Sequence, residues 1–232
     1  MKKKHILITG ASRGIGYQTA LTLAQAGHRV TALARSGDKL RQLQDQAADN
    51  IEIHQSDLTD PEDLSSLTGK LTNKGINLDG LIHNAGLLIN KPFTDLTDDD
   101  WYAMIEVNLM GPVRLTRSLL NLLNPGSHIV AISSMGGYQE SSKFPGLSGY
   151  SSSKGSLNIL TECLAKELTT HKISVNCLCL GAVQTEMLQK AFPGLQAPVT
   201  AKSMGRYISD FILDGHTYYN GKILPVALSD PG

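Results

Sequence analysis

The sequence is poor in cysteine, and the few cysteines it has are not spaced for pairing. Among its 232 residues there are three, Cys163, Cys177 and Cys179, and no C-x-x-C motif. An odd number without paired spacing argues against a disulfide framework or a zinc site, so we expect no bound metal. Because Cys177 and Cys179 stand two residues apart in an apolar run, we predict that they share one strand face as core thiols.

Excess charge and long hydrophobic runs are also missing. Lys+Arg 21 and Asp+Glu 21 give a net charge of zero, whereas nucleic-acid-binding proteins usually carry a basic patch, so we expect no nucleic-acid partner. No apolar run approaches the roughly 18 residues of a membrane span. The apolar stretch Ile6–Ile8 after the N-terminal lysines is shorter than the roughly 7–15 residues of a signal peptide. We therefore expect a soluble, cytoplasmic protein without a membrane partner.

What the sequence does contain is a regular alternation of short apolar runs with longer stretches of helical period. The predicted strands are His5–Thr9, Arg29–Leu33, Ile51–Gln55, Gly80–His83, His128–Ser133, Ser174–Leu180 and Lys222–Ala227. The predicted helices are Gly14–Ala26, Asp38–Asp49, Pro61–Lys74, Asp98–Leu123, Tyr150–Thr170 and Thr200–Leu213. Most of the strand runs are continuously apolar, which is typical of a parallel sheet covered on both faces. The alternation predicts one α/β domain over residues 1–232 with a doubly wound parallel sheet.

Glycine is plentiful, with 22 residues, and a glycine-rich loop follows the first predicted strand. The chain reads Thr9-Gly10-Ala11-Ser12-Arg13-Gly14-Ile15-Gly16 and then enters a predicted helix. Glycine lets the backbone approach a pyrophosphate, and a helix N-terminus offers free N–H groups and a positive dipole end. An ordinary strand-to-helix turn is the alternative, but the position after the first strand of an alternating chain favours dinucleotide binding.

Three motifs occur in a fixed order: the G-x-x-x-G-x-G loop, then Asn84-Ala85-Gly86, then Tyr150-x-x-x-Lys154. From about residue 5 to 185 this ordered set resembles the short-chain dehydrogenase/reductase family in its compact form. The resemblance implies a Rossmann-type sheet of about seven strands in the order 3-2-1-4-5-6-7, with helices on both faces. It also implies reversible hydride transfer between a nicotinamide cofactor and a carbonyl, and a homodimer or homotetramer.

The end of the second predicted strand predicts which cofactor binds. NAD enzymes of this fold carry an acidic residue there, whereas this chain reads Leu33-Ala34-Arg35-Ser36. Arg35, together with Arg13 in the glycine loop, can clamp a 2′-phosphate, so we predict NADP(H); the alternative is that both arginines are merely solvated. With the contacts that the resemblance implies, the predicted cofactor-binding residues are Gly10, Ser12, Arg13, Gly14, Ile15, Gly16, Arg35, Ser36, Asp57, Leu58, Asn84, Ala85, Gly86, Tyr150, Lys154, Gly181, Val183 and Thr185.

Tyr150 and Lys154 are four residues apart on a predicted helix, so their side chains share one face. A nearby ammonium favours the phenolate, so we expect Lys154 to lower the pKa of Tyr150; a solvated helix pair is the alternative. By resemblance, Ser134 binds the substrate carbonyl oxygen, with its neighbour Ser133 as the alternative.

The resemblance also assigns the main-chain carbonyl of Asn108 to a water relay that leads to Lys154. Pro112 lies four residues after Asn108 and has no N–H group. We therefore predict a kink in the helix and an Asn108 carbonyl without its helical donor.

Several positions depart from the family pattern. Leu180 stands where the family has proline, and His83 stands where it often has asparagine, which we interpret as structural. The spacing between Ser134 and Tyr150 is longer than expected, and we predict that the extra residues near Gln139–Lys143 lengthen a loop over the substrate pocket. We predict a substrate lid at about 186–198. Apolar wall candidates are Met135, Tyr138, Phe144, Met187, Leu188, Phe192 and Leu195.

Together these features predict an NADP(H)-dependent oxidoreductase that reduces a ketone, an aldehyde or a 3-oxoacyl thioester, with Tyr150 as general acid/base. Two alternatives remain: an NADPH-binding sensor or scaffold with little turnover, and an isomerase, dehydratase or epimerase on the same fold. Ile159 and Cys163 lie off the leucine stripe of their helix, so we predict that they face a partner helix. Ile223–Leu228 is the candidate for a second interface.

Overall fold

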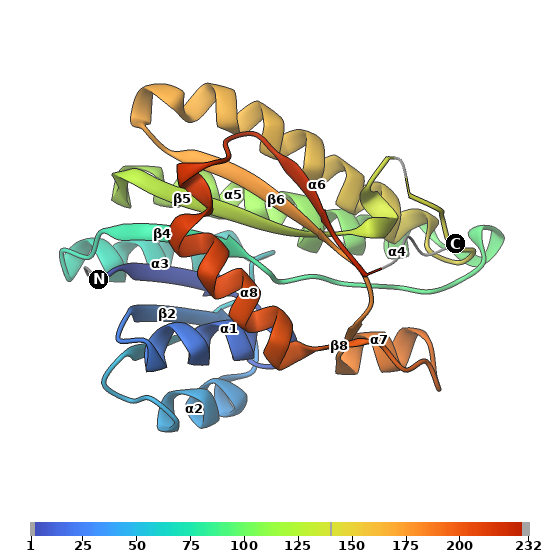
Figure 1. The fold of residues 1–232 in the computed structure, drawn as a ribbon, viewed down its shortest axis with the longest axis horizontal. Helices are drawn as coiled ribbons and strands as arrows, with labels where there is room; N and C mark the ends of the chain where they lie inside the picture. The colour runs from blue at the N-terminus through green and yellow to red at the C-terminus, as the bar shows by residue number, and fades with distance from the viewer. Residues whose placement is uncertain (1–2, 140, 229–232) are drawn as a thin grey trace.

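The computed structural model describes residues 3–139 and 141–228, and a seven-stranded parallel sheet runs through its centre (Figure 1). The strands are β1 (His5–Thr9), β2 (Arg29–Ala34), β3 (Ile51–Gln55), β4 (Leu78–His83), β5 (Leu123–Ser134), β6 (Ser174–Leu180) and β9 (Ile223–Val226). They pair in the order β3-β2-β1-β4-β5-β6-β9, which confirms the predicted topology. Two short strands, β7 (Val183–Gln184) and β8 (Val199–Thr200), form a separate parallel pair that was not predicted.

Helices cover both faces of this sheet. They are α1 (Gly14–Gln25), α2 (Gly37–Asp45), α3 (Pro61–Asn73), α4 (Asp98–Ile105), α5 (Gly111–Leu119), α6 (Ser148–Glu167), α7 (Glu186–Ala191) and α8 (Ala201–Asp214). Because successive strand residues point to opposite faces, Ile6 and Ile8 of β1 join a core with α1 and α8, whereas Leu7 joins a core with α3 and α5. This two-sided burial explains the continuously apolar strands. No helix among the described residues is both long and apolar enough to cross a membrane.

The prediction of one helix over Asp98–Leu123 is wrong. The chain forms α4, a π-helical turn over Glu106–Met110, α5 and a 3₁₀ turn, and Leu123 already belongs to β5. The Gly111 N–H donates to the Glu106 carbonyl, one residue further back than in an α-helix. Since Pro112 has no N–H, the helix is interrupted where the sequence predicted a kink.

Candidate active site

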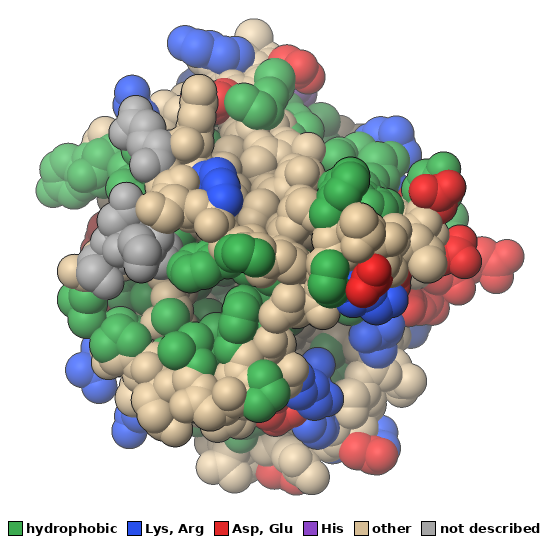
Figure 2. Space-filling view, turned by 90° about the vertical axis from the view of Figure 1, so that its right-hand side faces the viewer, with side chains coloured by type: hydrophobic (Ala, Val, Ile, Leu, Met, Phe, Trp, Pro, Cys, Tyr) green, Lys and Arg blue, Asp and Glu red, His purple; other side chains and the backbone are tan. Residues whose placement is uncertain are grey.

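A cavity of about 1110 Å³ opens at the carboxyl ends of the strands. Hydrophobic side chains gather around a hollow on this face of the molecule (Figure 2). Every predicted cofactor-binding residue lines the cavity except Gly16, where an added Cβ would lie 2.5 Å from the Gly10 carbonyl oxygen. Of the four predicted catalytic residues, Ser134, Tyr150 and Lys154 line it and Asn108 does not. The sequence therefore identified most of the cavity wall.

The glycine loop is shaped so that its backbone faces the cavity. The Asn84 amide donates to the carbonyls of Thr9 and Gly10, at 3.0 and 3.2 Å. A Cβ atom on Gly16 would lie 2.3 Å from that amide nitrogen, so only glycine fits. Helix α1 starts at Gly14 without a side-chain cap and without an acidic residue in its first turn. The N–H groups of this turn therefore remain available for an anion such as a pyrophosphate.

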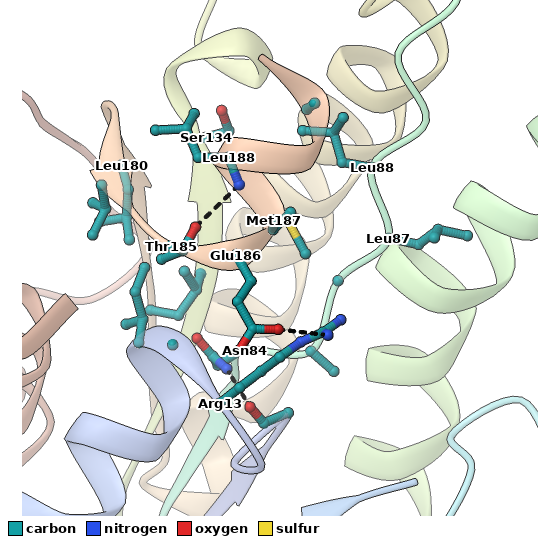
Figure 3. A pocket seen from close by; sticks show the side chains of 18 of the residues that line it. Arg13, Asn84, Leu87, Leu88, Ser134, Leu180, Thr185, Glu186, Met187 and Leu188 are labelled. Carbon is teal, nitrogen blue, oxygen red and sulfur yellow. Dashed lines mark hydrogen bonds and ion pairs between the residues drawn. The ribbon is translucent and has the colours of Figure 1, made fainter. Parts of the chain in front are cut away.

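Cations surround the cavity beyond the end of β2. Arg35 lies 3.9 Å from the Asp57 carboxylate, and Arg13 of the glycine loop donates to Glu186 at 3.1 Å (Figure 3). Lys39, near the start of α2, also lines the cavity and lies 3.8 Å from Glu186. The sequence patterns did not indicate Lys39 or Glu186 as cavity residues with paired charges, although Lys39 stands only four residues after Arg35.

Tyr150 and Lys154 lie side by side on α6, with the Lys154 ammonium nitrogen 5.9 Å from the Tyr150 ring centroid. That ammonium donates to the Ile132 carbonyl at 2.8 Å. Burial raises the pKa of Tyr150 to about 12, against a smaller opposing effect of a hydrogen bond with Ser134. Burial also lowers the pKa of Lys154 to about 8. The expected lowering of the Tyr150 pKa is therefore wrong for this structure, because desolvation of the phenol dominates.

The two serines at the end of β5 have different surroundings. The Ser133 hydroxyl donates to the Lys154 carbonyl at 3.1 Å and fastens α6 to the strand. The Ser134 hydroxyl accepts a hydrogen bond from the Gly136 N–H at 3.1 Å. Because Ser134 is also hydrogen-bonded with Tyr150, it is the better candidate for binding a carbonyl oxygen.

Asn158 on α6 connects the turn that follows Ser134 with the core thiols, and no sequence motif indicated it. Its amide donates to the Gly137 carbonyl at 2.9 Å. Its amide oxygen accepts from the thiols of Cys177 and Cys179, at 3.3 and 3.6 Å. A Cβ on Gly137 would lie 2.7 Å from the Gly155 nitrogen, so this turn rests directly on α6. The prediction that Cys177 and Cys179 are core thiols is confirmed.

The Asn108 side chain is fully buried and holds neighbouring segments together. It exchanges hydrogen bonds with the backbone of Leu87, both at 2.8 Å, and donates to the Ser153 hydroxyl at 2.9 Å. A Cβ on Gly86 would lie 3.4 Å from the Asn108 amide oxygen and 3.5 Å from the Lys154 nitrogen. Asn108, which belongs to the π-helical turn, thus lies close to Lys154, although it does not line the cavity.

The part of the cavity in which we expect the substrate to bind is apolar. Its lining includes Leu88, Met135, Phe144, Leu147, Leu180, Met187, Leu188, Phe192 and Leu195. The rings of Phe144 and Phe192 lie with their centroids 6.4 Å apart and their planes tilted by 59°. Tyr138 does not line the cavity, contrary to the prediction.

The loop expected over the pocket at Gln139–Lys143 also fails to reach it. Glu140 lies outside the described residues, and none of the other four lines the cavity. The Ser141 hydroxyl donates to the Tyr138 carbonyl at 3.0 Å and to the Met135 carbonyl, so the segment folds back on the preceding turn.

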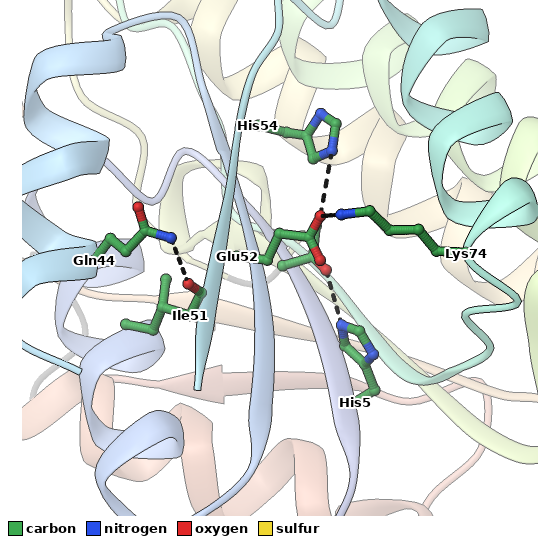
Figure 4. Close-up of polar contacts among 7 residues, drawn as sticks. His5, Gln44, Ile51, Glu52, His54 and Lys74 are labelled. Carbon is green, nitrogen blue, oxygen red and sulfur yellow. Dashed lines mark hydrogen bonds and ion pairs between the residues drawn. The ribbon is translucent and has the colours of Figure 1, made fainter. Parts of the chain in front are cut away.

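A second polar cluster lies on the edge strand β3 and outside the cavity (Figure 4). Glu52 forms an ion pair with Lys74, just beyond α3, and lies 4.0 Å from His54. On the neighbouring helix, the Gln44 amide donates to the Ile51 carbonyl at 2.8 Å. These contacts attach the edge strand to its two flanking helices, so we interpret the cluster as structural.

The comparisons with known proteins agree with this geometry. A family model described as short chain dehydrogenase matches residues 4–196. An uncharacterized oxidoreductase of Staphylococcus saprophyticus is 32% identical over 193 residues, which cover 81% of this chain and 81% of that protein. A 3-oxoacyl-[acyl-carrier-protein] reductase of Escherichia coli K12 is 29% identical over 201 residues, covering 86% of this chain and 81% of that protein.

A solved structure extends the likeness to nearly the whole chain. A short chain dehydrogenase from Burkholderia cenocepacia, in complex with NADP, superposes with a TM-score of 0.87 at 25% identity. The superposition covers 99% of this chain and 98% of that chain. With the ordered motifs and the observed strand order, these matches show that the chain belongs to the short chain dehydrogenase family of oxidoreductases.

Proposed function

We propose that the protein is an NADP(H)-dependent oxidoreductase that reduces a ketone, an aldehyde or a 3-oxoacyl thioester to the alcohol. The observation that carries this proposal is that one cavity holds Ser134, Tyr150 and Lys154 together with Arg13 and Arg35. It thus offers a proton donor for a carbonyl and cations for a phosphate. The Escherichia coli relative is named for a 3-oxoacyl substrate and the Burkholderia structure contains NADP, which support the two halves of the proposal.

The residues of this chain fit a nicotinamide dinucleotide, which supplies the hydride when bound. The uncapped first turn of α1 suits the pyrophosphate, and the glycine loop leaves room for its approach. Beyond β2 the lining offers Arg35 and Ser36 where an NAD enzyme would have an acidic residue. Arg13 and Lys39 add two further cations near the same end. We therefore assign the 2′-phosphate of NADP(H) to this part of the cavity.

The reacting residues favour the reductive direction. With its pKa raised to about 12, Tyr150 keeps its proton at neutral pH and can give it to the carbonyl oxygen. Ser134 holds that oxygen beside the phenol by a hydrogen bond. Lys154 places a positive charge near the phenolate that forms, which stabilises it. Asn108 anchors the π-helical turn next to Lys154, in line with the water relay that the family resemblance implies.

The apolar half of the cavity favours a carbonyl compound with hydrocarbon on at least one side. Phe144 and Phe192 form part of this wall, and Met187 and Leu188 belong to the proposed lid segment 186–198. We propose that the chain acts as one catalytic domain whose lid is contributed by α7 and the residues that follow it. The same lining accommodates a small ketone or the acyl part of a thioester.

The surface of α6 supports the proposal of a homo-oligomer. Ile159 is 61% exposed and Cys163 is exposed next to it, as expected of a helix face that packs on a partner. At the edge of the sheet, β9 has a strand neighbour only in β6 among the described residues, and it is the proposed second interface. Light scattering of the purified protein measures the number of copies.

The first experiment is NADPH consumption, followed by absorbance, with a panel of carbonyl compounds. The panel contains acetoacetyl thioester, diketones, aldehydes and steroid-like ketones, and NADH is tested beside NADPH. We expect turnover that favours NADPH. Tight NADPH binding without turnover on the whole panel would favour a sensor, and equal use of NADH would contradict the assigned cofactor.

Substitution of the cavity arginines tests the cofactor preference. We expect Arg13→Ala and Arg35→Ala each to weaken NADP⁺ binding about tenfold and to leave NAD⁺ binding nearly unchanged, because each removes a charge-assisted contact with the 2′-phosphate. Titration calorimetry measures both affinities. Arg206→Ala on α8, which removes an exposed arginine outside the cavity, is the control. Equal loss for both cofactors would indicate a general effect on the fold.

The pKa of Lys154 predicts how turnover depends on pH. Lys154 is charged below its pKa of about 8 and loses its charge as the pH rises through that value. We expect reductive turnover to fall above pH 8, because the developing phenolate loses its neighbouring cation. Tyr150, with its pKa of about 12, contributes no loss in this range. In a profile of kcat from pH 6 to 10, Lys166→Met should keep the descending limb, whereas residual turnover of Lys154→Met should lack it.

A further inference from the structure

The proposed lid begins with an acidic residue that pairs with Arg13 (Figure 3) and with Lys39. Glu186 is the first residue of α7. One of its carboxylate oxygens accepts a hydrogen bond from Arg13 at 3.1 Å, and the other lies 3.8 Å from the Lys39 ammonium. A single carboxylate thus connects the glycine loop, α2 and the lid, three segments that are far apart in the sequence.

These three side chains lie in the part of the cavity that the proposed function assigns to the 2′-phosphate. Arg13, Lys39 and Glu186 all line it together with Arg35 and Ser36 at the end of β2. The side chains of Arg13, Lys39 and Glu186 are 46%, 44% and 51% exposed, so a ligand that enters from solvent can reach the two cations. Glu186 pairs with both Arg13 and Lys39, whereas Arg35 pairs with Asp57.

We propose that Glu186 is an internal competitor for the 2′-phosphate and so sets how tightly the protein binds NADP(H). A phosphate monoester carries more negative charge than a carboxylate and three acceptor oxygens, so it can displace Glu186 from Arg13 and Lys39. NAD(H) lacks this phosphate and binds without breaking the two ion pairs. The inference rests on the proposed function, because it needs the 2′-phosphate to bind at these cations.

The strength of the effect follows from the exposure of the ion pairs. Exposed pairs are weak, so Glu186 lowers the affinity for the phosphate without preventing its binding. Glu186→Gln keeps the size of the side chain and removes its charge, which leaves both cations free for the phosphate. We expect this variant to bind NADP⁺ about three- to tenfold more tightly than the wild type, with NAD⁺ affinity within about twofold.

Titration calorimetry with oxidised cofactors measures this effect without turnover. The probes are NADP⁺, NAD⁺ and adenosine 2′,5′-bisphosphate, which carries the phosphate without the nicotinamide. The matched control is Glu167→Gln at the far end of α6, which removes the same charge outside the cavity. In an Arg13→Ala, Lys39→Ala background, Glu186→Gln should no longer change NADP⁺ affinity. Adenosine 2′,5′-bisphosphate should follow NADP⁺ in all variants.

The possible results distinguish a failure of the Glu186 competition from a failure of the NADP(H) assignment on which it rests. If the wild type prefers NADP⁺ but Glu186→Gln leaves its affinity unchanged or weakens it, the competition is disproved and the cofactor assignment stands. Equal tightening for NADP⁺ and NAD⁺ likewise disproves it, since the effect would not belong to the phosphate. A wild type that binds NAD⁺ as tightly as NADP⁺ overturns the proposed function, and the inference with it.

Discussion

Replacing Tyr150 with phenylalanine is expected to lower turnover about 10²–10⁴-fold, the usual contribution of a general acid. The substitution removes only the hydroxyl, and the ring keeps its place beside Lys154. The side chain is buried, and its pKa of about 12 keeps the phenol protonated at neutral pH, so that the proton is available for transfer to the substrate. NADP⁺ binding should change far less than turnover, because the lost step is proton transfer to the substrate oxygen.

The experiment measures both turnover and NADP⁺ affinity. The rate of NADPH consumption is compared for the wild type and Tyr150→Phe with a carbonyl that the wild type reduces, and NADP⁺ affinity is measured by calorimetry. Tyr102→Phe on α4 is the matched control, since it removes a phenol that is 66% exposed and outside the cavity. A Tyr150→Phe variant that keeps more than about a tenth of wild-type turnover would exclude Tyr150 as the acid.

The parts of the fold that the sequence predicted are those with local signals. Continuously apolar strands and the glycine loop indicate a parallel sheet and a dinucleotide site within a few residues of chain. The two core thiols follow from their spacing alone. Pro112 removes a helical donor, which predicts the interruption of the helix where the π-helical turn occurs. The length of that helix was wrong because apolar periodicity continues across the interruption and into β5.

Features that depend on packing between distant segments were either not predicted from the sequence or predicted wrongly. Glu186 meets Arg13 and Lys39 only in the folded chain, so no local pattern indicates their pairing. The pKa of Tyr150 is raised, whereas the sequence predicted a lowered value. Spacing on a helix reveals a neighbouring cation, but it does not reveal how deeply the phenol is buried.

Lowering the pH is expected to destabilise the protein through two buried histidines, His83 and His128. Burial lowers the pKa of each from 6.5 to about 3. The His128 ring donates from Nδ1 to the Ile212 carbonyl at 3.2 Å and accepts at Nε2 from the Asn176 amide at 3.0 Å. Protonation would add an N–H at Nε2 that faces another donor, so this arrangement needs the neutral ring.

The direction of the pH effect follows from proton uptake. Between pH 6.5 and 3 the unfolded state binds protons at these histidines and the folded state does not, so acidification favours unfolding. Each histidine contributes about 1.4 kcal/mol per pH unit in this range. At pH 6.5 half of the unfolded histidines are already protonated, so from pH 6.5 to pH 5 the free energy of unfolding should fall by about 3 kcal/mol for the two histidines together. Their contribution becomes constant about one pH unit above 6.5.

Urea denaturation at pH 7, 6 and 5 tests this prediction, with His83→Asn as the informative variant. Asparagine does not titrate, and although it is too short to keep the 2.8 Å contact of His83 Nε2 with the Thr116 hydroxyl, that loss lowers stability to the same extent at all three pH values and leaves the slope interpretable. We expect His83→Asn to remove about half of what His83 and His128 together contribute to the slope of stability against pH below 6.5. His171→Asn, which changes an exposed histidine, should keep the wild-type slope. An unchanged slope in His83→Asn would show that His83 does not remain neutral in the folded protein.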